Sequence, residues 1–288
     1  MLSMNALELR ADATAERAVE TFRQVGVAAD NLNGLTAGAS PEQVLNHYLS
    51  WTEEAERLLG NVLDAEVVSD LVHTQRYWTL RTATGELPRL VALVLAEADS
   101  RRRVLEEAGA ALQRERLRWK GQPARLVVPD TNMFLQADAP FEAIDWHAAL
   151  ASQGDIRLVV PHVVVYELDR LKRQGNSTTA RLARASLRWL AANLPDDPNG
   201  PPAKVAGGGS EPQTTIEVYV PAGPSRPEDA DGVIIRFARQ LGRISGMPTV
   251  LVTRDLGMRL RAVALGVDAV QLPEAAAPEK SSPTAAAS

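Results

Sequence analysis

Between residues 125 and 272, short runs of β-branched and aliphatic residues alternate with longer segments whose apolar residues recur at helical spacing. Strands joined through helices pair in parallel, and right-handed connections place helices against both faces of the sheet. The sequence therefore predicts a three-layer α/β/α domain with a parallel sheet. The expected strands span 125–129, 157–160, 215–220, 249–252 and 269–272, and the expected helices 141–152, 177–193, 230–244 and 256–265.

The stretch after the second expected strand is compatible with two structures. Residues 163–165 favour a strand by propensity, whereas Val164, Leu168 and Leu171 share one face of a helix. Pro161 favours the helix, because proline suits a helix start and is poorly placed inside a central strand.

Residues 11–120 follow a different pattern, in which acids and bases are interleaved with apolar residues at three- and four-residue spacing. Ser40, Pro41 and Gln43 have the order of a helix start with a capping box. We therefore expect several antiparallel helices in this half. Trp51, Tyr77 and Trp78 are interpreted as core residues, because aromatic residues at helical spacing are far more often core than a surface for stacking bases.

The predicted organisation is an all-α domain of unknown role over residues 1–120 and an α/β domain over 121–275. Residues 194–213 are rich in Pro, Gly and Asp and are expected to form a flexible insertion. The tail, 276–288, is rich in Ala, Pro and Ser and is expected to be disordered.

Composition excludes several kinds of site. The chain has no cysteine, so disulfides, thiolate metal sites and cysteine nucleophiles are ruled out. Its four histidines are scattered, so any metal would be held by oxygen. The net charge of -5 means that a nucleic-acid surface has to be local. The start lacks a signal-peptide pattern and no run is long and apolar enough to span a bilayer, so we expect a soluble cytoplasmic protein.

Acidic residues stand at the ends of the expected strands and helices. Each has a structural explanation by itself, as a turn-forming or helix-capping residue or as a partner of a nearby arginine. A parallel sheet would bring several of them to one edge, where carboxylates repel each other unless a cation neutralises them. Mg²⁺ or Mn²⁺, which prefer oxygen ligands and water, fit such a set. The acids are Asp130, Glu167, Asp229, Asp231 and Asp255.

The order of these acids resembles the order of the four acids in the PIN domain family of metal-dependent nucleases. Asp130 follows an apolar strand and precedes Thr131 and Asn132, as the first acid of that family does. Glu167 lies in an apolar and charged phrase typical of the second acid, Asp231 precedes an apolar segment as the third does, and Asp255 ends a Thr-x-Asp phrase as the fourth does. The resemblance covers about residues 125–273 and leaves the first 120 unexplained.

The resemblance implies a metal-dependent endoribonuclease that hydrolyses phosphodiester bonds and leaves 5′-phosphate ends. It assigns Asp130, Glu167, Asp231 and Asp255 to catalysis and metal binding with Mg²⁺ or Mn²⁺. Asp229 is an additional acid that would replace or assist Asp231. Asn132 and Thr253 are expected to orient the ligands or the attacking water.

Basic residues near the proposed acids are expected to hold the phosphates of RNA without reading its sequence. A set of solvated helix faces is the alternative interpretation. The residues are Arg170, Lys172, Arg173, Arg181, Arg236 and Arg254.

Two other functions stay open. One is a catalytically silent PIN-like module that binds RNA or protein, and the other is a structure-specific DNA nuclease. The helical half would supply dimerisation, substrate selection or regulation, with a second copy of the chain or a regulatory protein as its partner. We also expect the acidic site to survive removal of residues 1–120.

Overall fold

The structure is a computed structural model of the 288-residue chain. It describes residues 7–34, 38–83, 89–120, 124–137, 140–174, 176–194, 200–206, 212–220 and 229–272. The chain divides into two compact units. The first comprises Met1–Ala124, Val220–Pro227 and Arg236–Pro248, and the second Arg125–Tyr219, Glu228–Ile235 and Thr249–Ser288. The return of 236–248 to the first unit was not predicted.

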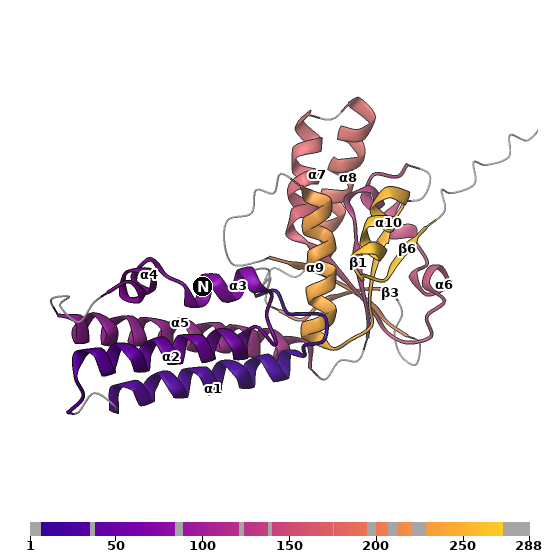
Figure 1. The fold of residues 1–288 in the computed structure, drawn as a ribbon. Coiled ribbons are helices and arrows are strands. Elements are labelled where there is room, and N and C mark those ends of the chain that lie inside the picture. Colours follow the sequence, from indigo (N-terminus) through magenta and orange to yellow (C-terminus); the bar gives the residue numbers. More distant parts are fainter. Residues whose placement is uncertain are drawn as a thin grey trace, which may run out of the picture. The chain divides into compact units, whose positions relative to one another are not determined.

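The first unit is helical, as predicted. Figure 1 shows α1, α2 and α5 running side by side, and Phe22, Tyr48 and Leu105 are among the side chains buried in this unit. Ser40 caps α2 in a reciprocal capping box with Gln43, which confirms the expected helix start. The helices are α1 (Ala15–Gly34), α2 (Pro41–Leu59), α3 (Ala65–Val72), α4 (Gln75–Arg81) and α5 (Leu90–Trp119).

The second unit contains a six-stranded sheet of order β3-β4-β2-β1-β5-β6. All neighbouring strands pair in parallel except β3, which is antiparallel to β4. Residues 126–128 of β1 are fully buried, as expected for a central strand with neighbours on both sides. The strands are β1 (Arg125–Pro129), β2 (Ile156–Pro161), β3 (Ala203–Ala206), β4 (Thr214–Tyr219), β5 (Thr249–Thr253) and β6 (Ala269–Gln271).

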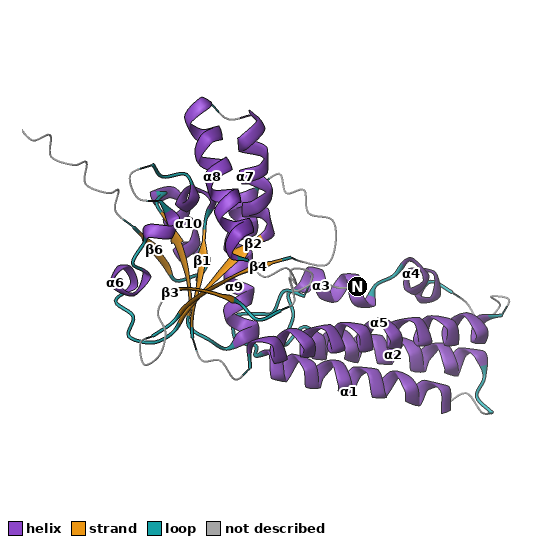
Figure 2. Cartoon of the chain, turned by 180° about the vertical axis from the view of Figure 1, so that it is seen from behind, coloured by secondary structure: helices purple, strands orange, loops and turns teal. Residues whose placement is uncertain are grey.

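The connections of the sheet run in two directions from its centre. The path from β1 through β2 to β4 runs toward one edge, and the path from β5 to β6 runs toward the other. Because such connections are right-handed, α6–α8 and α10 lie on opposite faces of the sheet, which is the predicted layering. Figure 2 shows the strands of the sheet among its helices. The connecting elements are η2 (Thr131–Phe134), η3 (Phe141–Ala143), α6 (Trp146–Leu150), α7 (His162–Gln174), α8 (Ser177–Asn193), α9 (Ala230–Ser245) and α10 (Leu256–Ala264).

Two sequence expectations need correction. Residues 203–206, inside the segment expected to be a flexible insertion, form β3, because the free edge of β4 offers them a backbone partner. Pro161 is the last residue of β2 and not the start of the helix, which begins at His162. Residues 195–199, 207–211 and the tail 276–288 lie outside the described residues. Within the described part of the chain, no helix has the length and apolar character to cross a membrane.

Candidate active site at the ends of β1 and β5

The carboxyl ends of β1 and β5 form the point at which the sheet reverses its order. From this pair of neighbouring strands the chain leads outward in opposite directions, to β2 and to β6. Connections that leave in opposite directions open a crevice above the strand ends, which is where open α/β sheets bind ligands. Asp130 directly follows β1, and Thr253 is the last residue of β5.

Asp130 is buried, with 1% of its surface exposed. Its Oδ1 accepts a hydrogen bond from the backbone N–H of Met133 at 3.0 Å, so that the carboxylate caps η2. Its Oδ2 accepts a hydrogen bond from Thr253 Oγ1 at 2.5 Å. Burial raises the pKa of Asp130 to about 6, against the lowering effect of these two hydrogen bonds. The negative charges of Asp231 and Asp255 raise the pKa further, so both acids lie within electrostatic reach of Asp130.

Thr253 connects Asp130 to Asp255. Its hydroxyl, fully buried, donates to Asp130 and accepts from the backbone N–H of Asp255 at 2.9 Å. Asp255 then caps α10, because its Oδ1 accepts from the backbone N–H groups of Gly257 at 2.6 Å and Met258 at 3.2 Å. The Thr253 hydroxyl therefore links the Asp130 carboxylate to the backbone of Asp255.

Asp229 and Asp231 differ in their surroundings. Asp229 pairs with Arg261 (Nη2 to Oδ2, 2.5 Å), and its Oδ1 also accepts from the backbone N–H of Gly232 at 2.9 Å. Asp231 lies in the first turn of α9, where burial, Asp229 and Asp255 raise its pKa and Arg261 lowers it. A Cβ at Gly232 would overlap the Asp229 carboxylate, so an alanine there would require the exposed Asp229 side chain to move.

Glu167 is positioned by the residue that follows Asp130. Thr131 Oγ1 donates to Glu167 Oε2 at 2.5 Å, which joins η2 to α7. Arg170, one turn further along α7, lies 3.6 Å from Glu167 Oε1. Asn132, the other predicted supporting residue, lies in η2 and is exposed.

The residues present can be compared with the needs of a divalent cation. The donor set consists of carboxylates, which suits Mg²⁺ or Mn²⁺. Burial is the main cause of the raised pKa of Asp130, and a cation would relieve the smaller contribution from repulsion by Asp231 and Asp255. Among the described residues, however, no three acids or histidines lie close enough together to form a ready metal site. The carboxylates of the site are therefore suitable ligands for a divalent cation. They are not already arranged as a cluster around a single cation position.

The predicted basic residues have different surroundings. Lys172 lies 2.5 Å from Asp169, and Arg173 pairs with the same carboxylate. Arg181 is exposed on α8, and Arg254 has a buried Nε without a hydrogen-bond partner. Arg236 belongs to the first unit, where its side chain is 52% exposed and lies 3.8 Å from Glu8.

Three residues have contacts in this site that the sequence analysis did not predict. Thr131 orients Glu167, Arg261 neutralises Asp229, and Gly232 leaves room for that pair. A threonine beside the first acid was a visible signal for Thr131. Arg261 is separated from Asp229 by 32 positions, so no local pattern identifies their pairing.

The family model of the PIN domain matches residues 127–273. Among solved structures, a domain of a functionally unknown protein from Methanocaldococcus jannaschii DSM 2661 is similar, with 19% sequence identity and a TM-score of 0.36. That match covers 54% of this chain and 95% of the other. No curated protein matches.

Proposed function

Because the chain belongs to the PIN domain family, we propose that it is a metal-dependent endoribonuclease acting at the ends of β1 and β5. The observation that supports this most is the buried Asp130, which is tied to Thr253 and lies in the electrostatic field of Asp231 and Asp255. Buried acids with raised pKa values in a strand-end crevice are typical of functional sites.

Asp130, Asp231 and Asp255 are the residues that would hold the cation. We prefer Asp231 to Asp229 because Asp229 is already engaged by Arg261 and by the N–H of Gly232. Asp231 also contributes to the raised pKa of Asp130. When bound, a divalent cation supplies polarisation of the phosphate and a lower pKa for the attacking water.

Glu167 completes the acidic set from α7. Thr131 fixes its Oε2, so the carboxylate has a defined orientation toward the end of β1. We assign Glu167 to binding the cation through water or to accepting a proton from the attacking water. Arg170, at 3.6 Å, would hold a phosphate oxygen beside it.

RNA is the proposed substrate, as the family resemblance implies. Lys172 and Arg173 on α7 and Arg181 on α8 carry positive charge on the helices next to Glu167. Asp169 offsets part of that charge, so Arg181 and Arg170 are the stronger candidates for phosphate contacts.

The experiment is cleavage of end-labelled RNA by the full chain, with Mn²⁺, with Mg²⁺ and with chelator. Asp130→Asn is the test variant, and Asp145→Asn, which alters an acid that caps α6, is the matched control. We expect cutting that requires metal, is lost in Asp130→Asn and is kept in the control. Mn²⁺ should also raise the melting temperature of the wild type and not of Asp130→Asn, a readout independent of turnover.

A silent binding module is the second candidate, because the described residues hold no ready cluster of three acids. RNA retention without cutting, together with no thermal shift in Mn²⁺, would favour that function. Cutting of a labelled DNA flap in preference to RNA would favour a DNA nuclease.

A further inference from the structure

Two aromatic side chains are exposed in the described part of the chain. Trp78 on α4 is 51% exposed and Tyr166 on α7 is 39% exposed, whereas Trp51 and Tyr77 are buried. The interpretation of Trp51, Tyr77 and Trp78 as core residues is therefore wrong for Trp78. Tyr166 directly precedes Glu167, an acid of the proposed site, so its exposure bears on how the substrate is held.

The contacts of the Trp78 ring lie within the first unit. The ring meets Tyr77 edge-on, with 5.1 Å between ring centroids, and the centroid of the His73 ring lies 5.6 Å away. The Arg81 guanidinium also lies 5.6 Å from the centroid of the Trp78 ring. These neighbours account for the position of Trp78 without a ligand.

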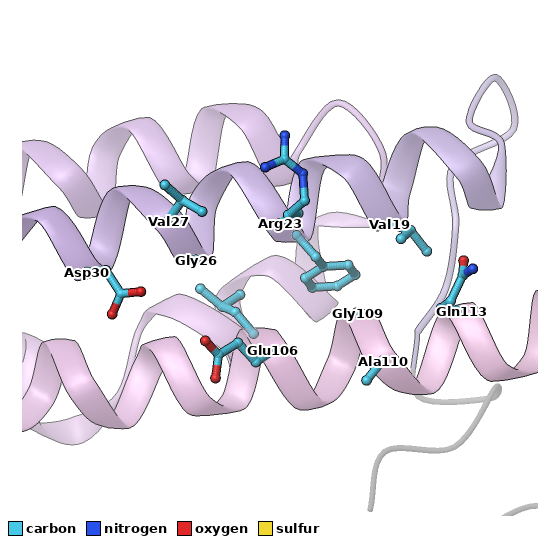
Figure 3. A pocket seen from close by; sticks show the side chains of 11 residues that line it. Val19, Arg23, Gly26, Val27, Asp30, Glu106, Gly109, Ala110 and Gln113 are labelled. Carbon is cyan, nitrogen blue, oxygen red and sulfur yellow. The ribbon is translucent and has the colours of Figure 1, made fainter.

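A cavity of the first unit lies between α1 and α5 and has a volume of about 350 Å³ (Figure 3). It is lined mainly by apolar and small residues. Its charged residues Arg23, Asp30 and Glu106 each have an ion-pair partner within the unit. The described residues of its lining therefore offer a phosphate no unpaired positive charge, and we expect contacts with a nucleic acid elsewhere.

Helix α7, in the second unit, buries one side and exposes the other. Val164 and Leu168 are fully buried, and at about 100° per residue Tyr166 lies on the opposite side of the helix. Among the described residues, the aromatic rings that pack on one another in this unit do not include Tyr166. They are Phe134, Phe141, Trp146 and Trp189. The exposed Tyr166 ring is therefore accessible to a flat ligand that stacks on it.

Arg170 connects Tyr166 to the acids at the end of β1. It follows Tyr166 by four residues and is therefore adjacent to it on the exposed side of α7. Its Nη2 lies 3.6 Å from Glu167 Oε1, which is too long for a hydrogen bond, so the guanidinium keeps N–H donors for another acceptor. Glu167 in turn accepts a hydrogen bond of 2.5 Å from Thr131, the residue after Asp130. The ring, the guanidinium and the acids thus follow one another on one surface of the second unit.

We propose that Tyr166 stacks on an unpaired base next to the phosphate that Arg170 holds, so that the site takes single-stranded RNA and rejects a duplex. The bases of a duplex are already stacked and paired, and its accessible minor groove presents base edges and hydroxyl groups instead of base faces. A single strand presents base faces, on which aromatic side chains stack while basic residues follow its phosphates. This inference rests on the proposed ribonuclease function and names the form of RNA that the site accepts.

The test is binding of fluorescein-labelled oligoadenylate to the full chain in chelator, as a single strand and as a duplex with oligouridylate. Tyr166→Ala should weaken binding of the single strand roughly tenfold and leave the weaker binding of the duplex unchanged, whereas Tyr166→Phe should keep most of the affinity. Arg170→Gln should weaken binding of both forms and reduce the salt dependence for the single strand by roughly 0.7 in logarithmic slope. Trp78→Ala, which removes the other exposed ring, is the matched control and should bind as the wild type does.

Photo-crosslinking locates the stacked base directly. Oligouridylate that contains 5-iodouridine is bound to the wild type in chelator and irradiated, because the excited base reacts with an aromatic ring that is stacked on it. We expect the cross-linked peptide to contain Tyr166, as identified by mass spectrometry of the digested protein. This measurement needs no substitution and therefore does not depend on the folding of a variant.

Equal affinity of the wild type and Tyr166→Ala for the single strand would overturn the proposal. A cross-link at Trp78, or tighter binding of the duplex than of the single strand by the wild type, would also overturn it. Metal-dependent cleavage that is lost in Asp130→Asn would then still establish the nuclease without Tyr166 as a contact. Weakened single-strand binding by Tyr166→Ala, in a protein that cuts no RNA, would support the contact and assign it to the silent binding module.

Discussion

Thr253, the last residue of β5, donates a hydrogen bond of 2.5 Å from its hydroxyl to Oδ2 of Asp130, at the end of β1. Both residues are buried, so the bond forms where water does not compete. Thr253 also accepts from the backbone N–H of Asp255, and the same hydroxyl thus sets the distance between two acids of the proposed site.

Replacing Thr253 with valine should raise the pKa of Asp130. The hydrogen bond from Thr253 favours the ionised carboxylate, so its loss moves the pKa above its present value of about 6. We expect the acidic limb of the pH–rate profile to move to higher pH. Thr253→Ser keeps the hydroxyl and should show the same pH–rate profile as the wild type. If the acidic limb of the valine variant does not move, the hydrogen bond from Thr253 does not control the pKa of Asp130.

Asp130→Asn should make the protein more stable at neutral pH while abolishing activity. The folded-state pKa of about 6 lies above the ordinary value of 3.8, so between these two pH values the folded state holds a proton that the unfolded chain has lost. Stability therefore falls as pH rises through that window. The loss at pH 7 is at most about 3 kcal/mol, from the difference in pKa.

Denaturant unfolding of the wild type and Asp130→Asn from pH 4 to pH 7 measures this effect. The stability difference should grow with pH and level off above pH 6. A difference that does not change with pH would show that Asp130 is not the titrating group. Mn²⁺ should reduce the stability difference between the two proteins, because it binds and stabilises the ionised site of the wild type.

Gly232→Ala should push Asp229 away from Arg261, so it should gain less stability than alanine normally gives a helix. A Cβ at this position would collide with Asp229 and approach Arg261 Nη2 to 3.0 Å. Both side chains are exposed and can move, so we expect the loss of their ion pair to offset most of the gain from alanine in unfolding free energy. Gly26→Ala in α1 is the matched control, because no atom lies within 4 Å of its added Cβ, and it should gain about 0.5–1 kcal/mol. Equal effects at both glycines would argue against the clash.

Arg157 and Glu217 form a buried ion pair across β2 and β4, with 2.6 Å between Nε and Oε1. Arg157→Met removes the positive charge that neutralises the buried Glu217, so the substitution should cost about 3–5 kcal/mol. The double variant with Glu217→Leu should recover most of that stability, because two apolar side chains leave no buried charge. Chemical denaturation of the three proteins tests this, and a double variant as unstable as the single one would refute it.

Removing residues 1–120 should expose the apolar side of α9, contrary to the independence that the sequence suggested. Residues 236–248 belong to the first unit, and Gln240 Oε1 accepts from the backbone N–H of Leu9 at 3.0 Å. Phe237 and Leu241 are buried in the full chain. The truncated protein should bind a hydrophobic dye and aggregate, and adding Phe237→Gln and Leu241→Gln should reduce both. A soluble, dye-free truncation would restore the original expectation.

The strand and helix periods, together with the acids at their ends, were sufficient to predict the α/β fold and the family, because these signals are local. The capping box of Ser40 and the helix over 177–193 were equally readable. Strand β3 was not, because four residues between Pro- and Gly-rich stretches carry no strand pattern, and only the free edge of β4 gives them a partner.

Tertiary structure decided the pairings between distant residues. Thr131 and Glu167 are 36 positions apart, Arg157 and Glu217 are 60, and Leu9 and Gln240 are 231. Each of these pairings depends on how the folded chain brings the side chains together and on how much water it excludes from them. A local sequence pattern determines neither. The exposure of Trp78 was settled in the same way, since periodicity places a residue on a helix face and only packing determines what covers that face.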